Sequence, residues 1–153
     1  MGSRPQSAAL SVSMAPEPRT LRVFFQQRLA QLTTELGSVR YAALATEDGL
    51  LIATDDDAEP NPLDRRGAVL SSFVAVARTT ARELELADAR CVLVECDGGL
   101  MVLRPFTTVQ GSGPRRRLLV VVLDDARELG RAVAAARRLA DEVGVRLAPG
   151  ADA

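Results

Sequence analysis

The feature that most constrains the fold is the stretch LDRRGAVLSSFVAVARTTARELEL at residues 63–86, where apolar side chains recur with the period of an α-helix. On a helical wheel the apolar arc is roughly 160° wide, whereas about 100° is enough for a helix that packs against one surface. This width predicts a long helix that covers a sheet with one broad apolar face. The arc consists of Val69, Leu70, Phe73, Val74, Val76, Ala77, Ala81 and Leu84.

A second face of the same helix carries only small side chains. Small side chains let another polypeptide backbone come close, so the helix is predicted to bury this face as well as the apolar one. The plainer alternative is that these residues reflect the alanine-rich composition of the chain. The small face consists of Ala68, Ser71, Ser72, Ala75 and Thr79.

Two further helices are predicted, one near each end of the chain. The first has leucine and phenylalanine at three- and four-residue steps, with Thr20 as its N-cap and Gly37 as its stop. The last begins where Asp125 and Glu128 resemble a capping box, and it is expected to end at Gly144.

Five apolar runs bounded by turn residues predict β-strands. The pair Asp48-Gly49 is a strong hairpin signal, and Asp97-Gly98-Gly99 predicts a second hairpin. Some of these strands are apolar on both faces, so the sheet needs cover on both sides. The strands are expected at residues 39–46, 50–54, 89–95, 100–104 and 118–123, with a loop at 107–117.

The order of these elements defines an α/β (α+β) fold, α-β-β-α-β-β-β-α. We predict a single antiparallel five-stranded sheet with helices on both faces, in a layout like that of profilin or longin domains. Residues 20–147 are expected to form this domain. Residues 1–19 are rich in proline, serine and alanine and are predicted to be a disordered tail, and 148–153 a short flexible one.

The composition argues against an enzyme. The chain has no histidine and no lysine, which removes the usual general base, the commonest metal ligand and the lysine of a phosphate loop. We therefore expect no catalytic residue, no cofactor and no metal. The formal net charge of -1 gives no attraction to nucleic acid. No apolar run reaches the ~20 residues that span a membrane, and a cytoplasmic location is expected.

Three polar features of the sequence are candidate sites. The aspartates at 55–57 offer oxygen ligands for a hard cation, but a solvated loop is the stronger interpretation. The stretch GSGPRRR at 111–117 suits a phosphate or an acidic partner, although a hairpin loop with a charged shoulder explains it better. Cys91 and Cys96 are five apart in one strand and hence on opposite faces, so buried, inert thiols are expected.

The segments VRYAALATEDGLLIA at 39–53 and VECDGGLMV at 94–102 are similar to the two hairpins of the Roadblock/dynein light-chain family. The alanine-rich helix between them and the strand at 118–123 match in place. The resemblance covers residues 20–147, and its order and spacing are more specific than any single motif.

This resemblance implies a homodimer or a heterodimer, in which the strand after the middle helix pairs with its twin and the two middle helices pack together. It further implies a regulator or scaffold that binds a small Ras-like GTPase, with a sensor-kinase-like protein as another partner. The family motif does not fix individual contact residues, and the helical wheel gives Arg78, Arg82 and Glu85 as the expected partner contacts. The expected dimer contacts are Ala68, Ser71, Ser72, Ala75 and Thr79 on the helix and Cys91, Val92, Leu93 and Val94 on the strand.

Two other classes of protein fit the same pattern of elements. One is a profilin-like or longin-like module that binds peptides, filaments or membrane-traffic partners. The other is a sensor with a small-ligand pocket between helix and sheet. A dimer through the middle helix favours the Roadblock interpretation, a monomer favours the first rival, and a co-purifying small molecule favours the second.

Overall fold

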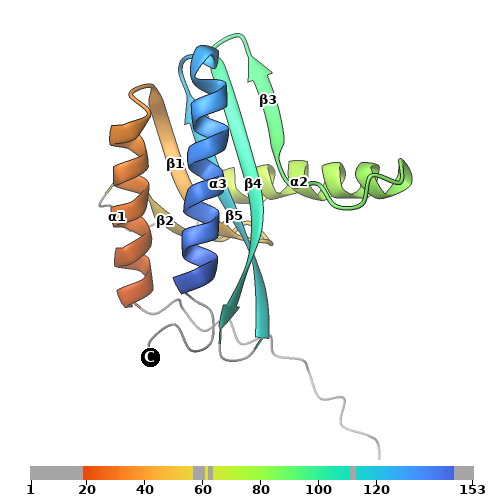
Figure 1. Ribbon diagram of the computed structural model, residues 1–153, viewed down its shortest axis with the longest axis horizontal. Helices are drawn as coiled ribbons and strands as arrows, with labels where there is room; N and C mark the ends of the chain where they lie inside the picture. Colours follow the sequence, from red (N-terminus) through yellow and green to blue (C-terminus); the bar gives the residue numbers. More distant parts are fainter. Residues whose placement is uncertain (1–18, 57–60, 62–63, 111–112, 147–153) are drawn as a thin grey trace, which may run out of the picture.

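The computed structural model describes residues 19–56, 61, 64–110 and 113–146, which form one antiparallel sheet covered by helices on both faces (Figure 1). The element order predicted from the sequence is confirmed. The strands lie side by side in the order β2-β1-β5-β4-β3. The elements are α1 (Arg19–Glu35), β1 (Val39–Thr46), β2 (Leu51–Thr54), α2 (Arg66–Glu83), β3 (Val92–Cys96), β4 (Gly99–Gln110), β5 (Gly113–Leu123), the short 3-10 helix η1 (Ala126–Glu128) and α3 (Leu129–Arg146).

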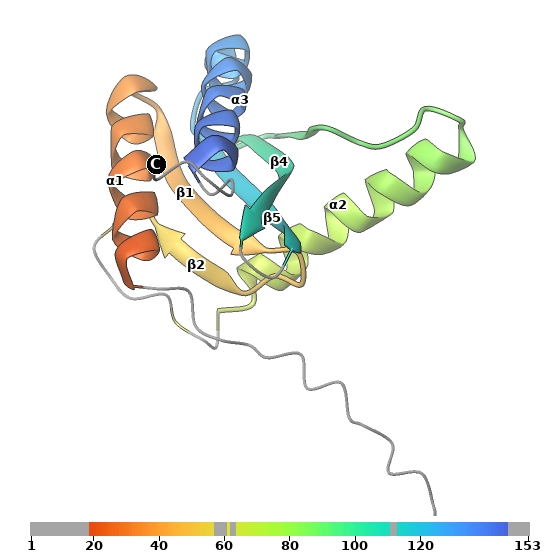
Figure 2. The same cartoon turned by 60° about the horizontal axis from the view of Figure 1, so that its bottom comes forward.

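The alternation of side chains along β5 explains the two-layer cover. Leu119 and Val121 point to one face, where they pack with α1 and α3, while Leu118 and Val120 point to the other face, towards α2. Helices α1 and α3 lie next to each other on the first face, and α2 alone crosses the second (Figures 1 and 2). The larger core therefore lies under α1 and α3, and the smaller one under α2.

The hairpin of β4 and β5 is longer than predicted. Residues 107–117 were expected to be a loop, but the ladder continues through Thr107↔Arg116 and Thr108↔Arg115. β-Branched residues at 107–109 favour extended backbone. Thr108 is fully buried, and its hydroxyl donates a hydrogen bond to the carbonyl of Arg115. This contact stabilises the extended part of the β4–β5 hairpin. The loop prediction was wrong because arginine-rich strands carry no clear apolar signal.

Several predicted helix ends also differ. Thr20 lies inside α1 and Gly144 inside α3, so neither marks a boundary. Asp125 does cap the turn before α3, accepting a hydrogen bond from the amide of Arg127 at 2.9 Å. The carboxylate of Glu128, however, accepts a hydrogen bond from Ser38 Oγ at 2.6 Å, which ties η1 to the segment between α1 and β1 instead of completing a capping box. In the described ranges no helix combines the length and apolar character needed to cross a membrane.

Candidate functional site: the outer faces of α2 and the β3 edge

Helix α2 presents three different faces, because only a narrow part of its apolar arc touches the sheet. Leu70, Val74 and Ala81 are buried, as the sequence predicted. The rest of the arc does not cover the sheet, which corrects the prediction of one broad buried face. We call these exposed residues the apolar stripe: Val69, Phe73, Val76 and Leu84.

One reason for this exposure is the direction of α2. The helix starts under the sheet and runs past the strand at its edge, so that its distal part projects from the body of the molecule (Figure 2). Among the described residues no strand of the same chain lies against this distal part. In the proximal turns, Val69 and Phe73 are exposed because they lie roughly 60–140° around the helix from the buried Leu70 and Val74. Val76 is 67% exposed and Leu84 63%, which is unusual for large apolar side chains that recur along one side of a helix.

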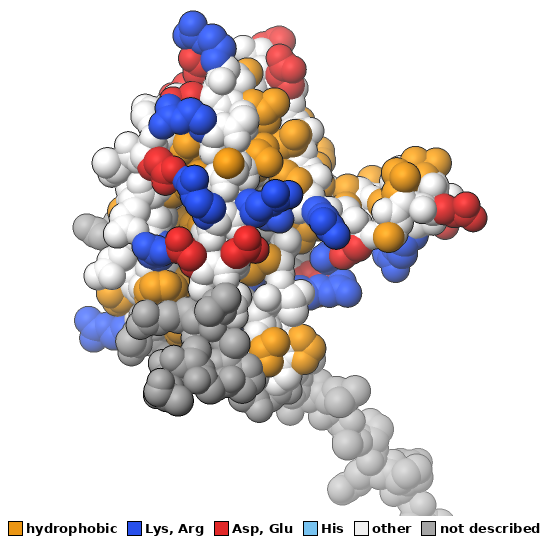
Figure 3. Space-filling model, in the orientation of Figure 1, with side chains coloured by type: hydrophobic (Ala, Val, Ile, Leu, Met, Phe, Trp, Pro, Cys, Tyr) orange, Lys and Arg blue, Asp and Glu red, His pale blue; other side chains and the backbone are white. Residues whose placement is uncertain are grey.

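The edge of the sheet next to this projection is also open. Strand β3 pairs with β4 on one side only, and within the described chain no strand covers its other side. Leu93 on this strand is 47% exposed. Apolar side chains gather on the projecting helix and along the neighbouring edge of the body (Figure 3). A bare apolar edge strand is a template for pairing with another chain.

The two cysteines differ in their surroundings. Cys91 is half-buried, and burial raises the pKa of its thiol, with Arg104 acting in the opposite direction. Cys96 is exposed at the end of β3, so the expectation that both thiols are buried was wrong for this residue. Both are free thiols.

The small face of α2 is exposed apart from the half-buried Ser71. Its hydroxyl groups are satisfied within the helix, since Ser72 Oγ donates to the carbonyl of Ala68 at 2.9 Å and Thr79 Oγ1 to that of Ala75 at 3.0 Å. The face is therefore free of polar groups that need a new partner. Ser71, Ala75 and Thr79 line a groove, whereas Ala68 and Ser72 do not.

This groove lies between α2 and the β4–β5 hairpin and has a volume of about 170 Å³. We call it the arginine groove, after Arg78, Arg82 and Arg116 in its walls. Glu47, from the turn after β1, bridges two of them. Its Oε1 accepts a hydrogen bond from Arg78 Nη1 at 3.2 Å and another from Arg116 Nη1 at 3.0 Å.

The predicted partner residues therefore lie in different settings. The side chain of Arg78 is only 11% exposed and is held by Glu47 and by Asp88, whose Oδ1 lies 3.1 Å from its Nε. Arg82 is exposed and donates from Nε to the carbonyl of Arg78 at 3.4 Å. Glu85 is exposed in the turn after α2, outside the groove, with a φ of 58°. The structure brings the two arginines together and leaves Glu85 apart.

The roles of Glu47 and Arg116 were not found from the sequence. They are distant from α2 along the chain, and only the sheet register places them beside it. The sequence predicts Arg116 in a charged loop, whereas it lies on strand β5. Its neighbour Arg117 is buried, at 3% exposure, which alternation along β5 explains.

Where α2 begins, three side chains fix its position. Asp64 accepts hydrogen bonds from the amide of Arg66 at 2.9 Å and from its guanidinium, and these bonds hold the pKa of the Asp64 carboxyl below its usual range. The same guanidinium stacks on the ring of Tyr41, 4.5 Å from the ring centre. Burial raises the pKa of Tyr41. The arrangement anchors the start of the helix to β1.

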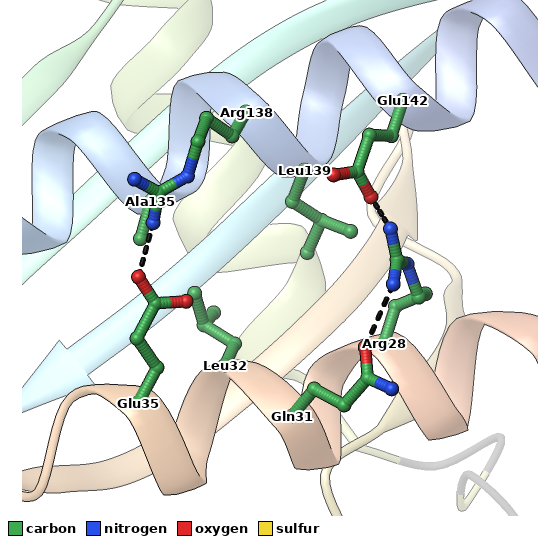
Figure 4. A pocket seen from close by; sticks show the side chains of 8 residues that line it. All are labelled: Arg28, Gln31, Leu32, Glu35, Ala135, Arg138, Leu139 and Glu142. Atoms are coloured by element: carbon green, nitrogen blue, oxygen red, sulfur yellow. Dashed lines mark hydrogen bonds and ion pairs between the residues drawn. The ribbon is translucent and has the colours of Figure 1, made fainter.

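A second hollow, of about 70 Å³, lies between α1 and α3 on the opposite face (Figure 4). Arg28 pairs with Glu142 across it and donates to Gln31 Oε1 at 2.7 Å, while Arg138 pairs with Glu35. Every charged group that lines it thus has a partner of the opposite charge. We interpret it as the seam between two packed helices and not as a binding site.

Comparison with solved structures shows what this arrangement is similar to. MglB in a tetrameric arrangement superimposes with a TM-score of 0.66 at 22% identity, covering 85% of this chain and 91% of that one. The Roadblock/LC7 domain from Streptomyces avermitilis gives 0.58 at 25% identity, with 77% and 92% covered. Acanthamoeba castellanii profilin IA gives 0.51 at 20%, with 77% and 94% covered. No curated protein matches the sequence.

A family model provides the assignment that structural likeness at such identity does not. The model of the Roadblock/LC7 domain matches residues 25–107, from α1 into β4. This range is more than half of the chain and contains both hairpin turns and all of α2. The chain belongs to the Roadblock/LC7 domain family.

Proposed function

We propose that the protein is a cytoplasmic, non-enzymatic regulator or scaffold that forms a homodimer and binds a small Ras-like GTPase. The observation that carries the proposal is the apolar stripe of α2 next to the open edge of β3. A monomer would leave both in water, which is unfavourable for large apolar side chains and for an unpaired strand.

A second copy of the chain is the partner that fits this surface best. Two β3 edges related by a two-fold axis can pair with each other and make one continuous sheet. The projecting part of each α2 would then lie under the sheet of the other protomer. Each stripe side chain that becomes buried contributes up to ~1.5–3 kcal/mol before the costs of association.

The proposed interface can now be divided by position. Residues 91–94 of the β3 edge and the apolar stripe form its centre, and Ala68 and Ser72 its margin. The arginine groove is lined by Ser71, Ala75 and Thr79, which the sequence predicts in the dimer contact. We assign them to the GTPase-binding side of α2, together with Arg78 and Arg82.

The GTPase proposal rests on membership of the Roadblock/LC7 family and on the exposed arginine of α2. It is tested by immobilising the protein and adding native cell lysate, once with GDP and once with a non-hydrolysable GTP analogue. Bound proteins are identified by mass spectrometry. We expect a small GTPase that is retained mainly with one nucleotide. The matched variants are Arg82→Glu, which should abolish retention, and Arg137→Glu on the exposed side of α3, which should not.

Each outcome of this experiment decides the proposal. Nucleotide-dependent retention that Arg82→Glu removes supports a regulator of the GTPase cycle. Retention of the same GTPase with either nucleotide supports a scaffold. The absence of any small GTPase under both conditions would refute the partner while leaving the family assignment intact.

A further inference from the structure

We propose that the arginine groove binds a carboxylate-rich segment of the partner protein, and that Glu47 occupies the place of a partner carboxylate until the segment arrives. This inference deepens the proposed function, on which it rests, by naming the chemistry of the contact. It derives from the charges and hydrogen bonds of the groove.

The groove holds more donors than its own acids can satisfy. Four arginines line the groove, of which Arg117 is buried and has an interaction of its own. The other three guanidinium groups face two carboxylates, that of Glu47 in the groove and that of Asp88 beside it. Among the described residues Arg82 meets no carboxylate, and its only hydrogen bond runs from Nε to the carbonyl of Arg78. The terminal nitrogens of its guanidinium are thus available, in a geometry suited to a carboxylate.

The carboxylate of Glu47 occupies the position that we assign to a carboxylate of the partner. One oxygen, Oε1, serves both Arg78 and Arg116, at 3.2 and 3.0 Å. The side chain comes from an exposed turn and is itself 55% exposed, so leaving the groove requires only a change of rotamer. The pair of Glu47 with Arg116 is exposed on both sides and therefore weak, so an incoming carboxylate can replace Glu47 there at little cost. At the more buried Arg78 the incoming carboxylate must take over the same hydrogen bond, so that the guanidinium keeps a partner of opposite charge.

The shape of the groove favours a polypeptide segment. Its floor includes the apolar side chains of Val74, Pro105 and Leu118, and its helical wall has small residues at Ser71 and Ala75. Small side chains let an extended backbone lie close to α2 while its acidic side chains reach the arginines. Clusters of arginine are a recurring means of recognising acidic motifs.

The groove remains open in the proposed dimer. At about 100° per residue, Arg78 and Ser71 lie roughly 140–180° around the helix from Val76 and Val69, with Ala75 roughly 100–120° from them. A protomer that packs on the apolar stripe therefore does not cover the groove. The same copy of α2 can serve the dimer with one side and an acidic partner with the other.

The test measures binding of a fluorescein-labelled oligoglutamate peptide to the full-length protein by fluorescence anisotropy at low salt. Arg82→Gln and Arg116→Gln should each weaken binding by roughly threefold to fivefold, the range of one exposed ion pair. Glu47→Gln should strengthen it by a similar factor, because the internal competitor is gone. The controls are Arg137→Gln and Asp97→Asn, which change the net charge equally at exposed positions outside the groove.

Opposite effects of Glu47→Gln and Arg82→Gln, with both controls at the wild-type value, support the proposal. Equal weakening by Arg82→Gln and Arg137→Gln would overturn it, since binding would then follow net charge alone. Weaker or unchanged binding by Glu47→Gln would overturn the placeholder role. No binding by the wild type would overturn the groove as an acidic site. The peptide contains no GTPase, so these results are independent of whether a GTPase is retained from lysate.

Discussion

The carbonyl oxygen of Gly49 lies directly against Gly67, so that the turn between β1 and β2 touches the first turn of α2 with no side chain between them. A Cβ atom on Gly67 would be 2.0 Å from that oxygen. Gly49 also has a φ of +92°, and a Cβ there would be 2.5 Å from the Cα of Ala68. This contact sets the height of α2 above the sheet.

Gly67→Ala should therefore destabilise the protein by about 3 kcal/mol, because backbone atoms on both sides must move apart. The measurement is urea unfolding followed by circular dichroism at a fixed protein concentration. Gly98→Ala is the matched control, since a Cβ there meets nothing within 4 Å. A change in stability below about 0.5 kcal/mol is expected for it. Equal stability of the two variants would contradict the close contact.

Val76→Asp and Leu93→Asp should each convert the proposed dimer into a monomer. Both side chains are well exposed in a single chain, at 67% and 47%, so a buried charge arises only in the dimer. Size-exclusion chromatography with light scattering measures the mass in solution. Val23→Asp on α1, where the side chain is 42% exposed, should leave the dimer intact. A wild-type monomer would refute the interface.

Ala75→Arg separates the two sides of α2. Ala75 lines the arginine groove, and the new side chain should fill the groove while leaving the solution mass unchanged. Oligoglutamate binding should fall, because the small side chain no longer makes room for a backbone. Dissociation of the dimer by this substitution would show instead that the small face carries the contact between protomers.

The ion pair of Asp64 with Arg66 predicts a pH-dependent difference in stability. Because the pKa of Asp64 is lowered in the folded state, its contribution is present above the unfolded pKa and is lost as the pH falls through the folded one. Relative to Asp64→Asn, wild type should be more stable near pH 6, by up to about 1 kcal/mol for this screened pair. The gap should close towards pH 2, as measured by urea unfolding. A gap that is constant with pH would contradict the ion pair.

Thiol labelling should distinguish the two cysteines. Thiolate is the reactive form, and burial raises the pKa of Cys91. Cys91→Ser, which retains the exposed Cys96, should react several-fold faster with iodoacetamide near pH 8 than Cys96→Ser, a magnitude set by exposure and thiolate fraction. Intact-mass spectrometry over time measures the rates. Equal rates would contradict the difference in burial.

The elements and their order follow from local patterns, which is why the sequence predicts them well. Asp48-Gly49 specifies its hairpin through turn geometry, and the apolar positions of α1 specify one buried face. The wrong predictions concern features that depend on contacts between distant parts of the chain. The ribbon of β4 and β5 is stabilised by pairing such as Thr107↔Arg116, which leaves no apolar periodicity to read.

The candidate site was predicted in part. The choice of α2 and β3 came from the sequence, but Val69, Phe73 and Val76 were assigned to the sheet. A helical wheel shows which residues share a face of the helix, but it contains no information about where the sheet under the helix ends. An apolar arc wider than one sheet face needs was the signal that part of it faces something else. The approach of Glu47 to Arg116 depends on tertiary structure alone.

Because α2 projects beyond its own sheet, the folding of its distal turns should depend on protein concentration. A single helix of this length is only marginally stable in water unless another surface packs against it. The proximal turns have that surface in every protomer, whereas in the proposed assembly the distal turns obtain it from the other copy. Dilution would then reduce the helical content before it unfolds the sheet. The concentration of the protein in the cell would therefore decide whether the partner-binding surface of α2 is ordered.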